Sequence, residues 1–348
     1  MSPSISVCIP AYNRASLLPP LLDSILRQPK RPLEIVVCED LSPERGEIRQ
    51  VCERYSRDFP GLINLHENPQ NLGYDGNLRR LVEVAKGDFC LFMGNDDLLS
   101  ENALAVITSA AERHPDVGVI LRSYASFDDD PEKPSQVFRY FPEERFFPAG
   151  AASISTVFRR SVVISGLTLH RQSALELSTN AFDGSLLYQL YLVARILSRM
   201  NAVFVPEVVA LYRNGGIPDF GNAESERGKF VPREHTPESS LHFMREMLRI
   251  AQHVETADKV AIYQPILQDI SRYSYPILSI QADKPRKIFI RYLRDLHGLG
   301  FGSSPLFFLY GLALLTLGAR NSELAIKFIK QKLGYTPTFG NIYRGRGS

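Results

Sequence analysis

The sequence has little net charge and few cysteines. Its 40 basic and 38 acidic side chains leave a formal charge of +2. This argues against a general nucleic-acid binder, because such proteins are usually strongly basic. The four cysteines lie within the first 90 residues and lack the Cys-x-x-Cys or Cys/His spacing of a zinc site. Three of them sit in apolar runs, so we interpret them as small buried apolar side chains.

Two glycine-rich motifs are also missing. No G-x-G-x-x-G follows the first apolar run, and no G-x-x-x-x-G-K-[ST] occurs anywhere in the chain. Such turns cradle phosphates at a helix N-terminus, so their absence argues against dinucleotide-binding and P-loop proteins. If this chain binds a diphosphate, a metal ion has to neutralise it instead.

A long membrane-spanning run is absent. The apolar run Leu306–Ala319 is shorter than the ~20 residues that a transmembrane helix needs. Two interpretations stay open: a buried helix, or an interfacial helix beside the basic tail Arg320–Ser348, which carries a net charge of +5. The opening MSPSISVCIP has no signal-peptide pattern. We therefore expect a cytoplasmic protein, either free or peripheral on the cytoplasmic face of the inner membrane.

Apolar runs alternate with amphipathic segments over the first 121 residues. The sequence predicts strands at about 5–10, 33–38, 62–66, 89–93 and 117–121, and helices at about 17–26, 47–57, 78–85 and 102–113. This alternation predicts an α/β fold with a mostly parallel sheet and helices on both faces.

The remaining segments are less regular. Residues 128–148 are predicted as a long loop with some strand, 183–200 as a helix, 202–211 as a strand and 215–231 as a mobile loop and linker. We expect an α/β catalytic domain over residues 1–230 and a mostly helical region with a basic tail over 231–348.

The stretch Lys86–Leu99, KGDFCLFMGNDDLL, is the centre of the predicted site. It is a buried strand that ends in Asn95, Asp96 and Asp97. Adjacent carboxylates need a counter-ion, and Mg²⁺ commonly binds one or two carboxylates together with substrate phosphates. A polar turn that caps the next helix through Asp97 or Ser100 explains the pair about equally well.

Two other strands should end at the same edge of the sheet. One leads into Pro10 and Tyr12, and the other ends at Asp40. Ligands of open α/β sheets lie outside the carboxyl ends of the strands. A flat aromatic ring, a carboxylate that accepts from a base N–H and a metal-holding acidic pair together suit a nucleoside diphosphate.

Four motifs in this order, PAYNR, EDLSPE, NLGYDGN and GNDDLL, resemble family 2 glycosyltransferases with the GT-A fold. The resemblance covers Ser4 to about Leu121. It points to the bacterial branch that builds O-antigen and capsule, including abequosyltransferase-like enzymes. It implies inverting transfer of a sugar from a UDP, GDP, dTDP or CDP sugar, with Mg²⁺ or Mn²⁺. The implied acceptor is a glycan or a glycan linked to a polyprenyl diphosphate.

The resemblance also assigns roles to residues. The family's base-binding positions fall on Pro10, Tyr12 and Asp40, and its metal motif falls on Asn95, Asp96 and Asp97. A further acid that the family usually has is missing where Gly94 or Asn95 stands, and Asp96 is the better metal ligand. A third set resembles the loop under the donor, although a turn and a helix cap explain it equally well: Asn71 and Asn77, with Arg79 or Arg80.

An inverting transfer needs a carboxylate base on the acceptor side. The family position falls on Asp183, just before an apolar helix, where a plain N-cap is the alternative. Glu176 and His170 are held in reserve. Arg213 could neutralise the diphosphate, but we interpret it as a surface arginine.

Two other functions remain as alternatives. A sugar nucleotidyltransferase would need a glycine-rich loop after the first strand, which PAYNRASLL lacks. A non-catalytic glycan-binding relative would have lost the acids of the NDD motif, which are present.

Overall fold

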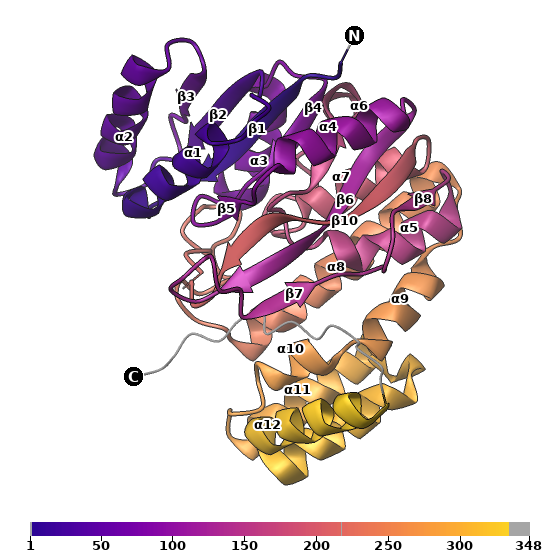
Figure 1. Cartoon of the computed structure of the whole chain (residues 1–348). Coiled ribbons are helices and arrows are strands. Elements are labelled where there is room, and N and C mark those ends of the chain that lie inside the picture. Colours follow the sequence, from indigo (N-terminus) through magenta and orange to yellow (C-terminus); the bar gives the residue numbers. More distant parts are fainter. Residues whose placement is uncertain (1, 217, 334–348) are drawn as a thin grey trace.

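The computed structural model describes residues 2–216 and 218–333, and it begins with a run of βα units (Figure 1). The strands are β1 (Ile5–Ala11), β2 (Glu34–Glu39), β3 (Ile63–Glu67) and β4 (Phe89–Phe92); the helices are η1 (Ala15–Leu17), α1 (Leu18–Leu26), α2 (Arg45–Asp58) and α3 (Gly73–Val84). These strands are parallel in the order β3-β2-β1-β4. The chain therefore winds outward in two directions from β1.

The sheet continues beyond β4 with strands of both directions, in the order β4-β9-β6-β10-β5. The short strand β9 runs antiparallel between β4 and β6, whereas β6 and β10 are parallel. The elements are β5 (Leu98–Leu99), α4 (Ala103–Arg113), β6 (Val117–Phe127), β7 (Gln136–Phe138), β8 (Arg145–Phe147), α5 (Ala151–Val157), η2 (Phe158–Ser161), β9 (Thr168–His170), α6 (Arg171–Glu176), α7 (Tyr188–Leu197) and β10 (Asn201–Arg213). The predicted α/β class is confirmed.

Alternating side chains of the central strands pack into two cores, one on each face of the sheet. Val7 and Ile9 of β1 pack with α1, α2 and α4, whereas Cys8 between them packs with α3 and α7. Both sets are apolar because helices cover both faces. All four cysteines are buried and free, as predicted.

After β10 and an irregular segment, helices make up most of the described chain from residue 237 onward, and α10 to α12 gather at one end of the molecule (Figure 1). They are α8 (Pro237–Asp258), α9 (Tyr263–Arg272), α10 (Tyr275–Ser279), α11 (Arg286–Gly298), η3 (Phe301–Ser303) and α12 (Pro305–Leu333). One hydrophobic cluster runs from the α3 and α7 face of the sheet into α8, α9, α11 and α12. A division at residues 230/231 stays a prediction.

The apolar run in α12 has two different sides. Phe307 and Leu314 are buried at 3%, whereas Phe308, Leu309 and Leu312 are 52%, 58% and 61% exposed. The buried side of the helix therefore fits the interpretation as a core helix, and the exposed side fits the interpretation as an interfacial helix. No helix in the described ranges is both long and apolar enough to cross a bilayer. Residues 334–348 of the basic tail lie outside the described residues.

Candidate active site

The carboxyl ends of β1, β2 and β4 meet where the strand order reverses, and a cavity of about 230 Å³ lies there. We call it the strand-end cavity. Doubly wound α/β sheets bind their ligands at this position. Its lining includes the residues predicted to bind the base, the predicted metal motif and Asn71 of the predicted donor loop: Pro10, Tyr12, Asp40, Asn71, Asn95, Asp96 and Asp97.

Asp40 is a buried carboxylate just beyond β2. Its Oδ1 atom accepts hydrogen bonds from Asn68 Nδ2 (2.8 Å) and from the backbone N–H of Leu72 (2.9 Å). Burial raises the pKa of Asp40 to about 6, and these hydrogen bonds oppose the shift. Asn68 also donates to Asn77 on α3, which donates in turn to Cys38 O. The loop and α3 thus hold this carboxylate in one orientation.

The other two predicted donor-loop positions make local contacts. Asn71 Oδ1 accepts from the backbone N–H of Gly73 (3.0 Å) and closes the turn before α3. Arg80 forms an exposed ion pair with Glu83 (3.2 Å), one turn along the same helix. Of these two, only Asn71 lines the strand-end cavity.

Asp96 forms an ion pair across the cavity with Arg14, whose Nη1 lies 2.6 Å from Asp96 Oδ2. Arg14 follows β1, and it and Asn13 both have left-handed backbones, with φ of 62° and 56°. Asn95 Nδ2 donates to Asn13 O (2.9 Å), so the ends of β1 and β4 are joined twice. Two adjacent non-glycine residues in this conformation store strain, which is common at functional sites.

Asp97 is turned inward, although it lines the same cavity. Its Oδ1 accepts from the backbone N–H of Arg213 (2.9 Å), and its Oδ2 accepts from Ser165 Oγ. Burial and the neighbouring Asp96 raise the pKa of Asp97 to about 8. The Arg213 side chain is also occupied, because its Nε donates to Asp96 O (3.1 Å) and its guanidinium lies over the Phe127 ring.

These residues can hold a divalent metal that shares its coordination with a substrate. Both Asp97 oxygens accept protein hydrogen bonds. Asp96 is partly exposed, and its Oδ2 forms the ion pair with Arg14, a position that a metal ion can take. Within the described ranges, no three acidic, histidine or cysteine side chains gather into a metal cluster. Mg²⁺ and Mn²⁺ are often held by one carboxylate plus phosphate oxygens, so Asp96 fits such an ion once a diphosphate is present.

Residues 218–226 cover the strand-end cavity, in a segment predicted as a mobile loop and linker. Asn13 Nδ2 donates to Asp219 Oδ2 (3.3 Å). Glu226 is buried and accepts from the backbone N–H groups of Tyr74 (2.8 Å) and Gly221 (2.7 Å). Burial raises the pKa of Glu226. This carboxylate could not be predicted as a site residue, because it stands in a polar segment without periodicity.

Asp183 forms a bidentate ion pair with Arg79, whose Nη1 and Nη2 lie 2.6 and 2.9 Å from its two carboxylate oxygens. Asp183 is not part of the lining of the strand-end cavity. The prediction that it opens the helix is wrong, because α7 begins at Tyr188. The intervening turn includes Gly184 and Leu186 with positive φ values of 82° and 62°.

Asp75 explains why α7 begins late. Its carboxylate lies at 1% exposure and accepts from the backbone N–H groups of five consecutive residues, Gly184 to Tyr188, each at 2.9 Å. Burial raises the pKa of Asp75 to about 6, against these hydrogen bonds. Asp75, a residue of α3, thus accepts the hydrogen bonds that the side chain of a local N-cap residue would otherwise accept. Asp75 and Arg79 stand one turn apart on α3, so this helix holds both Asp183 and the turn after it.

The reserve candidates lie elsewhere. His170 pairs with Phe89, the first residue of β4, and therefore lies at the opposite end of that strand from Asp96. Its Nδ1 is 2.9 Å from Ser173 Oγ. Glu176 accepts from Gln172 on the surface of α6. Neither residue lines a cavity described here.

The fold resembles solved glycosyltransferases over nearly the whole chain. S. aureus TarS 1-349, in complex with UDP-GlcNAc, has a TM-score of 0.57 at 15% identity and covers 98% of this chain and 95% of its own. The mannosyltransferase PcManGT from Pyrobaculum calidifontis, in complex with GDP-Man and Mn²⁺, has a TM-score of 0.53 at 17% identity, with 95% and 88% covered. The chain therefore has the GT-A fold, as predicted.

Residues 6–175 match the family model "Glycosyl transferase family 2", and this part of the chain belongs to that family. Curated relatives include abequosyltransferase RfbV of Salmonella typhimurium, 33% identical over 113 residues, or 32% of this chain and 34% of the relative. Another is the GalNAc(5)-diNAcBac-PP-undecaprenol beta-1,3-glucosyltransferase of Campylobacter jejuni, 29% identical over 109 residues, or 31% and 35%. The chain thus spans about a third of the length of these relatives.

Proposed function

We propose that this protein transfers a sugar, with inversion, from a nucleotide-sugar donor to a glycan or lipid-linked glycan in bacterial surface polysaccharide biosynthesis. One observation carries the proposal: Tyr12, Asp40 and Asp96, from three separate strand ends, line a single cavity at the switch point of the sheet. The membership of residues 6–175 in a glycosyltransferase family supports the same chemistry.

On the donor side, each residue has a role that its chemistry suits. Asp40 accepts an N–H of the nucleotide base, because its carboxylate is fixed and lies at the cavity wall. Tyr12 packs against the base, and Pro10, Asn71 and Asn95 shape the walls. Asp96, which pairs with Arg14 in the present arrangement, would hold the metal ion that neutralises the donor diphosphate. A bound Mg²⁺ or Mn²⁺ stabilises the charge of the leaving diphosphate.

On the acceptor side, Asp183 accepts the proton of the attacking hydroxyl. Its ion pair with Arg79 opens in the acceptor complex, because in the present arrangement Asp183 lies outside the strand-end cavity. General-base help of this kind accelerates a reaction by ~10²–10⁴-fold. Asp75 keeps the turn in place while Arg79 releases the carboxylate.

The end of the molecule that α10 to α12 form meets the cytoplasmic face of the inner membrane (Figure 1). Exposed apolar side chains of α12 and the basic helix α11 suit an anionic lipid surface. One relative named above acts on an undecaprenol-linked glycan.

Thermal protection tests the donor assignment. Each of UDP, GDP, dTDP and CDP is added to the full chain with and without Mn²⁺, and the melting temperature is measured. We expect one nucleotide to stabilise the protein more strongly with Mn²⁺, since a ligand that binds only the folded state raises its stability. Release of sugar from the matching nucleotide sugar then separates a transferase from a non-catalytic glycan-binding relative. Release of pyrophosphate from a nucleoside triphosphate and a sugar phosphate would instead indicate a nucleotidyltransferase.

A further inference from the structure

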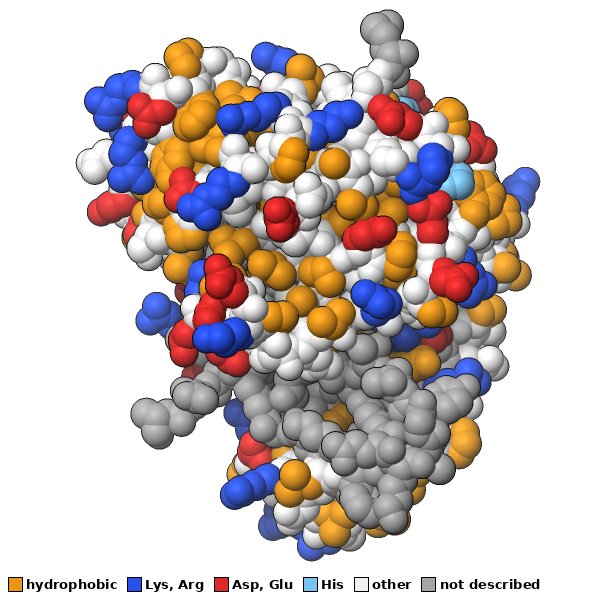
Figure 2. Space-filling view, in the orientation of Figure 1, with side chains coloured by type: hydrophobic (Ala, Val, Ile, Leu, Met, Phe, Trp, Pro, Cys, Tyr) orange, Lys and Arg blue, Asp and Glu red, His pale blue; other side chains and the backbone are white. Residues whose placement is uncertain are grey.

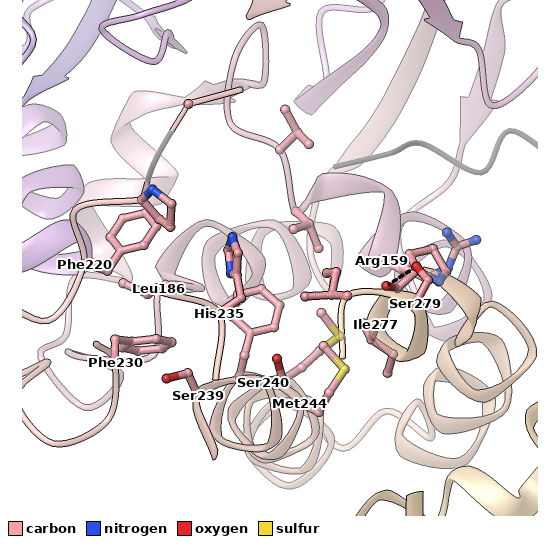
Figure 3. A pocket seen from close by; sticks show the side chains of 18 of the residues that line it. Arg159, Leu186, Phe220, Phe230, His235, Ser239, Ser240, Met244, Ile277 and Ser279 are labelled. Carbon is pink, nitrogen blue, oxygen red and sulfur yellow. Dashed lines mark hydrogen bonds between the residues drawn. The ribbon is translucent and has the colours of Figure 1, made fainter. Parts of the chain in front are cut away.

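A second and larger cavity of about 880 Å³ lies between the sheet domain and the C-terminal helices. Its walls come from α7, from residues 230–235, from α8 and from α10, which lie far apart in the sequence. Figure 3 shows Phe230, Met244 and Ile277 from three of these segments, together with Leu186 from the turn before α7. We call it the helix-side cavity. Its volume suits a ligand of drug size or larger.

The floor of the helix-side cavity is apolar. Phe243, Met244 and Met247 line it from α8, and Ile270 and Ile277 line it from α9 and α10. These five side chains offer a glycan no hydrogen bonds, and each unpaired hydroxyl costs free energy, although polar side chains, among them Gln189, Ser239, Ser240 and Asp283, also line the cavity. The floor therefore favours an aliphatic chain, whose burial contributes favourably for every CH₂.

The helix-side cavity and the strand-end cavity share a wall. Tyr74 and Phe220 line both, and their rings contact each other edge to face at 5.6 Å. Val162 and Val163 also line both cavities. A molecule in the larger cavity can therefore present one end to a donor in the smaller one. Aromatic rings at that junction suit the apolar face of a sugar.

The surface around the helix-side cavity has the exposed apolar and basic side chains that suit contact with an anionic lipid surface. Ala319 lines the cavity just beyond Gly318, whose non-helical backbone breaks α12, and the part of α12 before this break exposes Phe308, Leu309 and Leu312. The neighbouring α11 exposes the basic residues Arg286, Lys287, Arg291 and Arg294. At the lower end of Figure 2, where these helices lie, blue and orange side chains lie at the surface. A lipid drawn from an anionic surface would arrive beside the cavity.

We propose that the helix-side cavity binds the aliphatic chain of a lipid-linked acceptor, with the acceptor's sugar at Tyr74 and Phe220. Placement of that sugar rests on the proposed function, whereas chain binding stands on the cavity alone. The ligand chemistry is an aliphatic phosphate, and its chain is either isoprenoid or saturated.

The chain has no tryptophan, so a single Phe243→Trp substitution places a unique fluorophore in the wall of the helix-side cavity. Butyl to dodecyl phosphates are titrated below their micelle concentrations, in buffer without vesicles. We expect binding to tighten about fourfold for each added CH₂ and to level off once the cavity is filled. Farnesyl and dodecyl phosphate have main chains of equal length, so the tighter of the two identifies an isoprenoid or a saturated source.

Two matched variants in the Phe243→Trp background locate the chain. Ile277→Glu places a carboxylate in the cavity wall, and Ile288→Glu places one on the outer side of α11, where Ile288 is 43% exposed. We expect Ile277→Glu to weaken dodecyl phosphate binding at least tenfold and Ile288→Glu to change it less than twofold. Equal affinity in both variants, affinity independent of chain length, or equally strong competition by a methyl glycoside would each overturn the proposal.

Nucleotide protection is measured on the same protein samples. Protection by a nucleotide without binding of any alkyl or farnesyl phosphate rejects the lipid cavity and leaves the glycosyltransferase intact. Chain binding without nucleotide protection rejects the proposed function and leaves the cavity assignment standing. Retained protection in Ile277→Glu also shows that this variant folds.

Discussion

Replacing Asp40 by asparagine removes one acceptor while keeping the shape of the side chain. Asn68 and Leu72 both donate to Asp40 Oδ1, and an asparagine oxygen in that position can accept the same two hydrogen bonds. The new amide N–H₂ group then faces the N–H of the nucleotide base. A hydrogen bond to a charged group is worth ~1.5–3 kcal/mol, so we expect the dissociation constant of the nucleotide to rise about 10- to 150-fold.

The pH dependence of binding provides a second measurement on Asp40. Burial raises its pKa to about 6, and only the ionised form accepts a base N–H. Its carboxylate is therefore mostly ionised at pH 7 and about one-tenth ionised at pH 5, so affinity should fall about tenfold as the pH drops across this window. In Asp40→Asn the part of this decline that is due to Asp40 should vanish, leaving only the titration of other cavity groups such as Glu226. A nucleotide sugar is the right probe, because its diphosphate does not titrate in this range.

Isothermal titration calorimetry at pH 5, 6, 7 and 8 measures both effects. Asp129→Asn is the matched control, because Asp129 is exposed and lines neither cavity. Unchanged affinity of Asp40→Asn at pH 7, or a decline toward pH 5 that is as steep in this variant as in the unmodified protein, would refute the base-reading role.

The remaining predictions concern other carboxylates and one helix. Asp96→Asn should abolish the extra nucleotide protection that Mn²⁺ gives; full transfer by this variant in EDTA would contradict metal binding there. Asp183→Asn should lower kcat by ~10²–10⁴-fold with donor affinity unchanged, and near-normal kcat would reject the base role. Asp75→Asn should lower the free energy of unfolding by at least ~3 kcal/mol in urea denaturation, since buried N–H donors lose their acceptor; a loss below ~1 kcal/mol would be inconsistent with this. Leu309→Glu with Leu312→Glu should reduce sedimentation with anionic vesicles but spare nucleotide protection, whereas unchanged sedimentation would place the contact elsewhere.

The sequence was sufficient for the first four strands and for the convergence of three strand ends at one edge of the sheet. Apolar runs located β1 to β4, and parallel topology implied that Tyr12, Asp40 and Asp96 would meet. The sequence could not predict the direction in which the side chains of the site point. Asp96 and Asp97 are adjacent, yet one is paired with Arg14 and the other is bonded inward, a difference that depends on Ser165 far along the chain.

Long-range contacts explain why β9, the start of α7 and the role of Glu226 were not predicted from the sequence. The strand β9 has three residues, too few for a visible period, and its place between β4 and β6 depends on pairing rather than on pattern. The late start of α7 depends on Asp75, about a hundred residues earlier, so a local capping rule applied to Asp183 gave the wrong boundary. Glu226 had no signal in its own segment.

The anchoring of one turn by Asp75 has a consequence for building hybrid enzymes. The family match ends at residue 175, which makes that position an obvious junction for exchanging acceptor halves between relatives. A junction there separates Asp75 and Arg79 from the turn at 183–188 that they hold. A working chimera would therefore have to transplant α3 together with the incoming C-terminal half, so the unit of exchange is discontinuous in sequence.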